Sequence, residues 1–199
     1  MIEREGLVHV YTGTGKGKTT TSLGLALRAL GHNLSVYMIQ FMKSGDTGEL
    51  FSVQKYLPNF QIIQFGKDAL AEKQLKIYSF EGKEADVKQL SEEEIYTFRS
   101  DDDEKEPARM GFEHAKRIVM NGQHDLVILD EINCVLDKKL IPVEEVLELI
   151  QQKPKHVELV LTGRGAPAEI LKAADYVSEI RRIKHPYDVG ILARKGIEY

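Results

Sequence analysis

Residues 12–20 read Thr12-Gly13-Thr14-Gly15-Lys16-Gly17-Lys18-Thr19-Thr20. An apolar run at 7–11 precedes this stretch, and apolar residues at helical spacing follow it between Leu23 and Leu30. A strand, a glycine-rich turn and a helix in this order, with Gly-Lys-Thr at the turn, are typical of a phosphate-binding loop. Glycines let several backbone N–H groups converge on one anion, and the start of the helix adds its positive dipole end.

The side chains of this loop have separate expected roles. Lys18 supplies a mobile positive charge for phosphate oxygens. Thr19 offers a hydroxyl to a magnesium ion, which prefers oxygen ligands and retains bound water. The residues that we expect to contact a bound nucleotide are Gly13, Thr14, Gly15, Lys16, Gly17, Lys18, Thr19 and Thr20.

The loop departs from the common pattern G-x-x-x-x-G-K-[ST] at its first position. Thr12 stands where that pattern has glycine, and Lys16 adds a second cation. The loop should still hold phosphates, although it need not hold them in the way that a hydrolase does.

The composition is that of a soluble globular protein. The chain has 199 residues, of which 42% are hydrophobic and 29% charged, and its net charge is −4. This length suits one α/β domain covering 1–199, and the net acidity gives no electrostatic reason to expect a nucleic-acid partner. No apolar run is long enough to span a membrane, and residues 1–5 do not resemble the start of a signal peptide. With one cysteine, Cys134, these features predict a cytoplasmic protein.

The segments 34–39, 60–65, 125–129 and 156–161 are largely apolar and predict strands, as does the segment 176–183, and these segments alternate with helical patterns. Such alternation predicts a mostly parallel sheet with helices on both faces. Residues 66–106 show no clear pattern, and an irregular insert of this length in a compact domain is usually functional. We expect this insert to form a lid or part of a substrate pocket.

Charged residues follow three of the predicted strands, where ligands bind in open parallel sheets. Lys43 is a candidate phosphate or substrate contact, although a solvated surface lysine fits its position equally well. Asp130 and Glu131 are candidate magnesium ligands, with helix capping as the alternative. Arg164, flanked by glycines, suits the charge of a triphosphate, and the alternative is a structural loop arginine.

The loop at 12–20, the segments 40–43, 129–131 and 162–165, and the tail at 177–199 together resemble the phosphate-loop type of ATP:corrinoid adenosyltransferase. The resemblance implies a RecA-like fold, a homodimer, and ATP bound with magnesium or manganese. It also implies transfer of the 5′-deoxyadenosyl group of ATP to the Co(I) of a reduced corrinoid, with release of triphosphate, in adenosylcobalamin synthesis or salvage. An electron-donating flavoprotein would supply the Co(I).

In that reaction the cobalt is the nucleophile, so the protein has to orient the substrates and neutralise the leaving group. The residues that we expect to carry this catalysis are Lys16, Lys18 and Arg164. Two other functions fit the same motifs: a RecA-like ATPase or small-molecule kinase that cleaves the β–γ bond, and a nucleotide-binding regulatory module. Glu131 favours the hydrolytic alternative because a glutamate there can align water, whereas the unusual loop and the tail favour adenosyl transfer.

Overall fold

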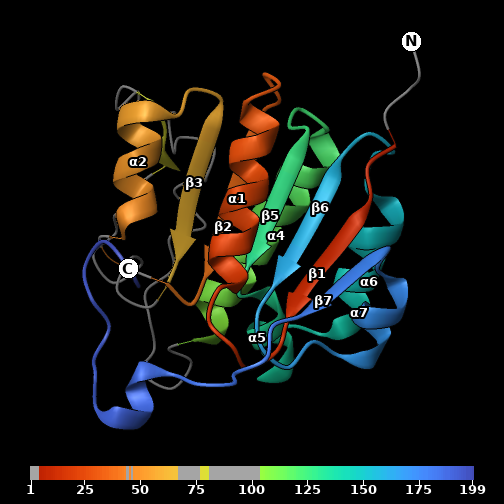
Figure 1. Cartoon of the computed structure of the whole chain (residues 1–199). Helices are drawn as coiled ribbons and strands as arrows, with labels where there is room; N and C mark the ends of the chain where they lie inside the picture. The colour runs from red at the N-terminus through yellow and green to blue at the C-terminus, as the bar shows by residue number, and fades with distance from the viewer. Residues whose placement is uncertain (1–4, 44, 46, 67–76, 81–103) are drawn as a thin grey trace.

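The computed structural model describes residues 5–43, 45, 47–66, 77–80 and 104–199. Its strands form one sheet in the order β4-β3-β2-β5-β6-β1-β7 (Figure 1). All neighbouring strands are parallel except β3 and β4, which are antiparallel. The strands are β1 (Val8–Thr12), β2 (Val36–Phe41), β3 (Phe60–Phe65), β4 (Ile77–Tyr78), β5 (Leu126–Asp130), β6 (Glu158–Thr162) and β7 (Tyr176–Glu179).

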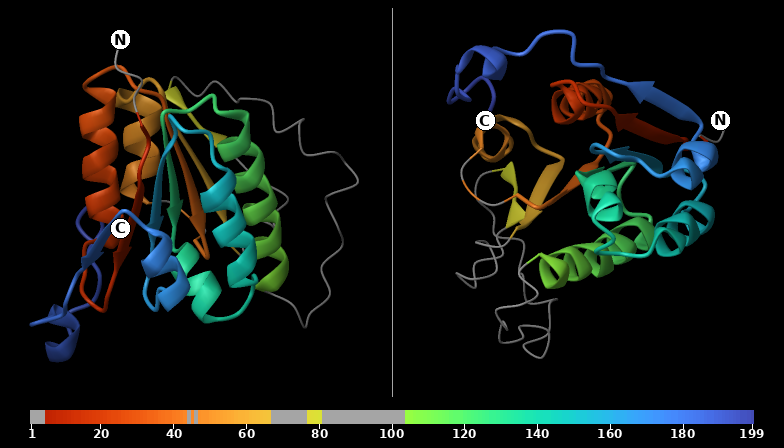
Figure 2. Two further views of the ribbon diagram at one scale, coloured as in Figure 1. Left: turned by 90° about the vertical axis from the view of Figure 1, so that its right-hand side faces the viewer. Right: turned by 90° about the horizontal axis from the view of Figure 1, so that it is seen from below.

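Helices cover both faces of the sheet (Figure 2). Two of them, α1 (Lys18–Leu30) and α2 (Gly48–Tyr56), lie on one face. The helices on the opposite face are α4 (Lys105–Asn121), α5 (Ile132–Asp137), α6 (Val143–Gln152) and α7 (Ala168–Ala173). A 3₁₀ helix, η4 (Pro186–Val189), lies in the C-terminal tail.

The central strands are buried on both sides because successive side chains point to opposite faces. Met38 and Ile128 pack in the apolar cluster that includes residues of α1 and α2. Their neighbours Ile39 and Leu129 pack in the cluster on the side of α4 to α7. A strand that is buried on both faces has a nearly continuous run of apolar residues in its sequence. The structure therefore confirms the parallel sheet that these runs predict.

The sheet has the α/β arrangement of a RecA-like phosphate-loop domain, as the family resemblance implies. The strand that leads into the loop, β1, and the strand that ends at Asp130, β5, are separated by β6. The carboxyl ends of these strands meet at the same edge of the sheet, which is the lower edge in Figure 1. The candidate residues on the loop, after β2, after β5 and after β6 therefore lie near one another.

Two strand boundaries and one helix differ from the sequence predictions. Strand β2 extends to Phe41, so Gln40 is a strand residue rather than part of a following loop. Strand β7 ends at Glu179, and the next residues cross the phosphate loop instead of continuing to position 183. Helix α5 directly follows Glu131 and was not predicted, because its six residues are too few for a helical pattern.

The predicted lid or substrate-pocket insert, 66–106, lies mostly outside the described residues, which include only 66, 77–80 and 104–106 of it. Its proposed role therefore stays a prediction. Among the helices that the structure describes, none combines the length and apolar character needed to cross a membrane.

Candidate nucleotide-binding site

The phosphate loop joins β1 to α1, and two of its glycines have backbone angles that other residues rarely adopt. The φ angle is +101° at Gly13 and +122° at Gly17. Lys18 is buried, and its Nζ donates hydrogen bonds of 2.9 Å to the carbonyl oxygens of Gly13 and Gly15. Burial lowers the pKa of Lys18, and the Glu131 carboxylate opposes that shift. The lysine thus lies against its own loop, positioned to turn toward phosphate oxygens.

The C-terminal tail forms one wall of this loop. The N–H of Gly15 donates a 2.7 Å hydrogen bond to the carbonyl of Ile180, and the N–H of Ile180 donates one of 2.8 Å to Thr12. A Cβ at Gly13 would lie 2.5 Å from the Ile180 oxygen, and one at Gly15 would lie 2.8 Å from the Arg181 backbone. These two glycines are therefore needed for the close approach of the tail, and the Gly15 N–H already has a protein partner.

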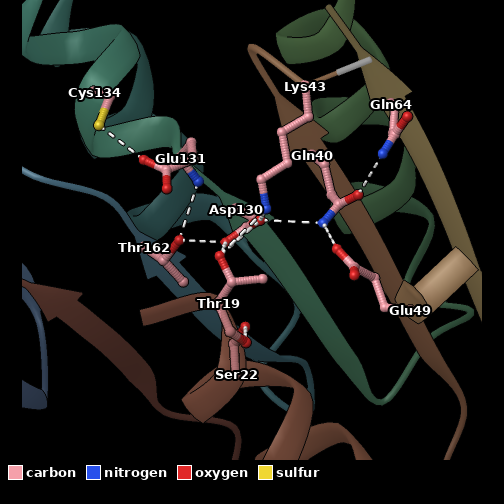
Figure 3. A network of polar contacts seen from close by, with 10 residues as sticks. All are labelled: Thr19, Ser22, Gln40, Lys43, Glu49, Gln64, Asp130, Glu131, Cys134 and Thr162. Atoms are coloured by element: carbon pink, nitrogen blue, oxygen red, sulfur yellow. Dashed lines mark hydrogen bonds and ion pairs between the residues drawn. The ribbon is translucent and has the colours of Figure 1, made fainter. Parts of the chain in front are cut away.

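Asp130 is the centre of the polar network at the sheet edge (Figure 3). Its side chain is fully buried. Thr19 Oγ1 donates to Oδ1 over 2.9 Å, and Thr162 Oγ1 donates to the same oxygen over 2.6 Å. Lys43 Nζ lies 2.7 Å from Oδ2, and Gln40 Nε2 lies 3.2 Å from it. The structure thus brings together three candidates from separate segments: Thr19, Lys43 and Asp130.

A second layer of polar side chains fixes this network. The Gln40 amide also donates to Glu49 over 2.9 Å, and Gln64 Nε2 donates to Gln40 Oε1 over 2.9 Å. The N–H of Glu131 donates to Thr162 Oγ1 over 3.0 Å. Because the polar side chains around Asp130 are hydrogen-bonded to it or to one another, its carboxylate is held in one orientation.

Glu131 follows Asp130 in a left-handed backbone conformation, with φ of +65°. Its carboxylate accepts a 2.8 Å hydrogen bond from Cys134 Sγ and does not join the network around Asp130 in Figure 3. Burial and the Glu131 carboxylate raise the pKa of the Cys134 thiol to about 12. The thiol is consequently protonated at neutral pH and unsuited to act as a nucleophile.

The two remaining predicted cations lie at the rim. Lys16 is exposed, and its charge acts on Glu198 of the C-terminal tail. Arg164 is also exposed and lies close enough to lower the pKa of Lys18. Its backbone N–H donates to Cys134 Sγ over 3.2 Å. Because both side chains are exposed, they can approach a ligand bound at the loop.

Comparison with known proteins places the chain in a family. The family described as "ATP:corrinoid adenosyltransferase BtuR/CobO/CobP" matches residues 4–199. This chain belongs to the ATP:corrinoid adenosyltransferase family.

Curated relatives agree with this assignment. The corrinoid adenosyltransferase of Escherichia coli K12 is 32% identical over 200 residues, which cover 99% of this chain and 87% of that protein. The corrinoid adenosyltransferase CobA of Salmonella typhimurium LT2 is 33% identical over 199 residues, with the same coverage. Among solved structures, EssC (ATPases 2 and 3) from Geobacillus thermodenitrificans superposes with a TM-score of 0.43 at 15% identity, covering 96% of this chain and 35% of that one.

The oxygen atoms of this candidate site suit a magnesium ion shared with a nucleotide. Thr19 Oγ1 and the Asp130 carboxylate are hard oxygen donors that already lie within 2.9 Å of each other. Within the described part of the chain, no cluster of three or more His, Cys, Asp or Glu side chains forms a complete metal site. Mg²⁺ typically binds through one or two protein ligands, with phosphates and waters completing the shell.

Sequence reasoning assigned no role to four residues of this candidate site. They are Gln40, Glu49, Gln64 and Thr162. The glutamines carried a usable signal, because a buried amide near the carboxyl end of an apolar strand requires a polar partner. Glu49 carried none, since a glutamate in the first turn of a helix is ordinary.

Proposed function

We propose that this chain transfers the 5′-deoxyadenosyl group of ATP to the Co(I) of a reduced corrinoid and releases inorganic triphosphate. Membership of the adenosyltransferase family over residues 4–199 carries this proposal. The convergence of the phosphate loop, Thr19 and Asp130 at one sheet edge supports it, since these groups suit a triphosphate and its metal ion.

In the proposed reaction, the electron pair of Co(I) attacks C5′ of ATP and the C5′–O bond breaks. The bonding electrons leave with the triphosphate, and cobalt is formally oxidised to Co(III). Because cobalt is the nucleophile, the protein does not need an activated Ser, Cys or His. The protonated state of Cys134, with its pKa of about 12, agrees with this.

The protein has to bind and orient the triphosphate and neutralise the negative charge that grows as it leaves. Lys18 and the free N–H groups at the start of α1 would bind phosphate oxygens. Lys16 and Arg164, at the rim, would approach the triphosphate once ATP is bound. Thr19 and Asp130 would hold Mg²⁺, which neutralises phosphate charge when bound. The role of Glu131 as a further metal ligand stays a prediction.

The Glu131 side chain also bears on the alternative of an ATPase or kinase. A hydrolase would use this carboxylate to align water, yet here it accepts a hydrogen bond from Cys134. This contact favours adenosyl transfer over cleavage of the β–γ bond.

Other parts of the proposal follow from the family. We propose a cytoplasmic homodimer of single-domain chains that uses Mg²⁺ or Mn²⁺ and receives Co(I) corrinoid from an electron-donating flavoprotein. The segment at 66–106 would cover the corrinoid.

Product analysis tests the proposed reaction. The protein is incubated with MgATP, with and without chemically reduced cobalamin, and the phosphorus products are separated. Adenosyl transfer predicts triphosphate and adenosylcobalamin in equal amounts, only when corrinoid is present. Orthophosphate, or a phosphorylated acceptor, would instead support a hydrolase or kinase.

A further inference from the structure

The ammonium group of Lys43 lies among the oxygens assigned to magnesium. Its Nζ is 2.7 Å from Asp130 Oδ2 and 3.3 Å from Thr19 Oγ1. Thr19 and Asp130 are themselves in contact over 2.9 Å. One positive charge therefore touches both proposed protein ligands of the metal, as Figure 3 shows.

The buried carboxylate needs this charge when no metal is bound. The Asp130 side chain has no exposed surface, and a buried charge is costly unless it is paired. In the part of the chain that the structure describes, Asp130 forms its ion pair with Lys43, while its other contacts come from neutral hydroxyl and amide groups. Lys43 thus supplies locally the positive charge that a metal ion would bring.

The position of Lys43 also allows its side chain to move away from Asp130. Lys43 lies two residues beyond the end of β2. The residue between them, Met42, has a φ angle of +56° and turns the chain at the edge of the sheet. The Lys43 side chain is 26% exposed, whereas that of Asp130 is fully buried. A long, flexible lysine side chain can therefore move its charge while the carboxylate stays fixed by Thr162 and Gln40.

We propose that Lys43 is a resident cation that occupies the magnesium position in the nucleotide-free protein and exchanges with the metal when metal and nucleotide arrive together. This inference rests on the proposed MgATP site. While the ammonium group stays at ion-pair distance from Asp130, it repels a metal ion that approaches the same carboxylate, so free metal should bind weakly. ATP favours the exchange because its phosphates bind both the metal and the displaced ammonium group. Lys43 thereby couples metal binding to nucleotide binding.

The proposal predicts the affinity of the nucleotide-free protein for Mn²⁺ alone. Titration followed by the electron paramagnetic resonance of free Mn²⁺ measures this affinity without ATP or corrinoid. The variant Lys43→Met removes the charge but keeps an unbranched side chain. It should bind Mn²⁺ more tightly than the unaltered protein by about tenfold or more, because a competing charge at ion-pair distance has been removed.

Two control variants locate the effect. Lys155→Met removes an exposed lysine ahead of β6, at the opposite edge of the sheet, and should leave Mn²⁺ affinity unchanged. Adding Asp130→Asn to Lys43→Met should abolish the gain, because the gained site uses that carboxylate. Equal Mn²⁺ affinity in Lys43→Met and the unaltered protein would overturn the proposal, as would a gain that survives Asp130→Asn.

Thermal unfolding supplies a second readout. Lys43→Met leaves the Asp130 carboxylate unpaired, so its melting temperature should fall and Mn²⁺ should restore it, with a much smaller effect on the unaltered protein. If this variant does not fold, Lys43→Gln retains an amide donor without the charge and takes its place in both measurements. Neither measurement involves adenosyl transfer, so failure of the proposed reaction and failure of the cation exchange are distinguishable.

Discussion

The variant Gly15→Ala tests whether the C-terminal tail is part of the nucleotide site. A methyl group at position 15 would lie 2.8 Å from backbone atoms of Ile180 and Arg181, and backbone atoms cannot rotate away. We expect the tail to separate from the loop and the hydrogen bonds Gly15–Ile180 and Ile180–Thr12 to be lost. At about 1 kcal/mol for each bond, the free energy of unfolding should fall by about 2 kcal/mol.

For a chain of 199 residues, this loss corresponds to a fall of about 4–8 °C in melting temperature. Urea unfolding measures the free energy, limited trypsin digestion measures release of the tail at Arg181 and Arg182, and calorimetry measures MgATP affinity. The free energy of unfolding, the release of the tail and the MgATP affinity should change together.

The control is Gly24→Ala on α1, where an added Cβ would meet open space. It should stabilise the helix by up to about 1 kcal/mol. A Gly15→Ala protein with unchanged stability and a protected tail would refute this reasoning.

Three further predictions concern individual side chains. Thr19→Ala should weaken MgATP binding, with partial recovery at higher metal concentration, whereas Thr21→Ala, at an exposed position of α1, should have little effect; normal binding by Thr19→Ala would remove Thr19 from the metal site. Cys134→Ser should retain adenosyl transfer and its pH profile, because the thiol pKa of about 12 keeps it protonated; inactivity of a folded, ATP-binding Cys134→Ser protein would indicate thiol chemistry. Burial lowers the pKa of His114 to about 4. The contribution of the neutral ring to stability is therefore complete above about pH 6.5, the pKa of histidine in the unfolded chain, and is lost as the pH falls toward 4. His114→Gln should reduce that pH dependence in urea unfolding, and an unaltered dependence would show that other groups cause it.

Strong local patterns made much of the fold predictable. The apolar runs that became β3 and β5 are bounded by turn residues, so their strands appear where expected. Helix α5 was missed because it is short and begins directly after the left-handed residue Glu131. The end of β2 was misjudged because Gln40 is polar, although its amide is satisfied inside the network around Asp130.

The glycine pattern of the loop shows why the site was only partly predictable. Gly13 and Gly15 suggested phosphate contacts, and the structure adds a second reason for them, the close approach of Ile180 and Arg181. That partner segment lies about 165 residues further along the sequence, so no local pattern reveals it. The contact of Lys43 with Thr19 and Asp130 likewise depends on the packing of β2 beside β5.

The absorption spectrum of Co(I) tests the proposed function most directly. Reduced cobalamin and MgATP are mixed anaerobically, with and without the protein, and the Co(I) band is followed while triphosphate is measured. Adenosyl transfer predicts that the band disappears only with protein, ATP and metal all present, and that one triphosphate forms for each cobalt consumed. A stable Co(I) band together with rapid release of orthophosphate from ATP would contradict it.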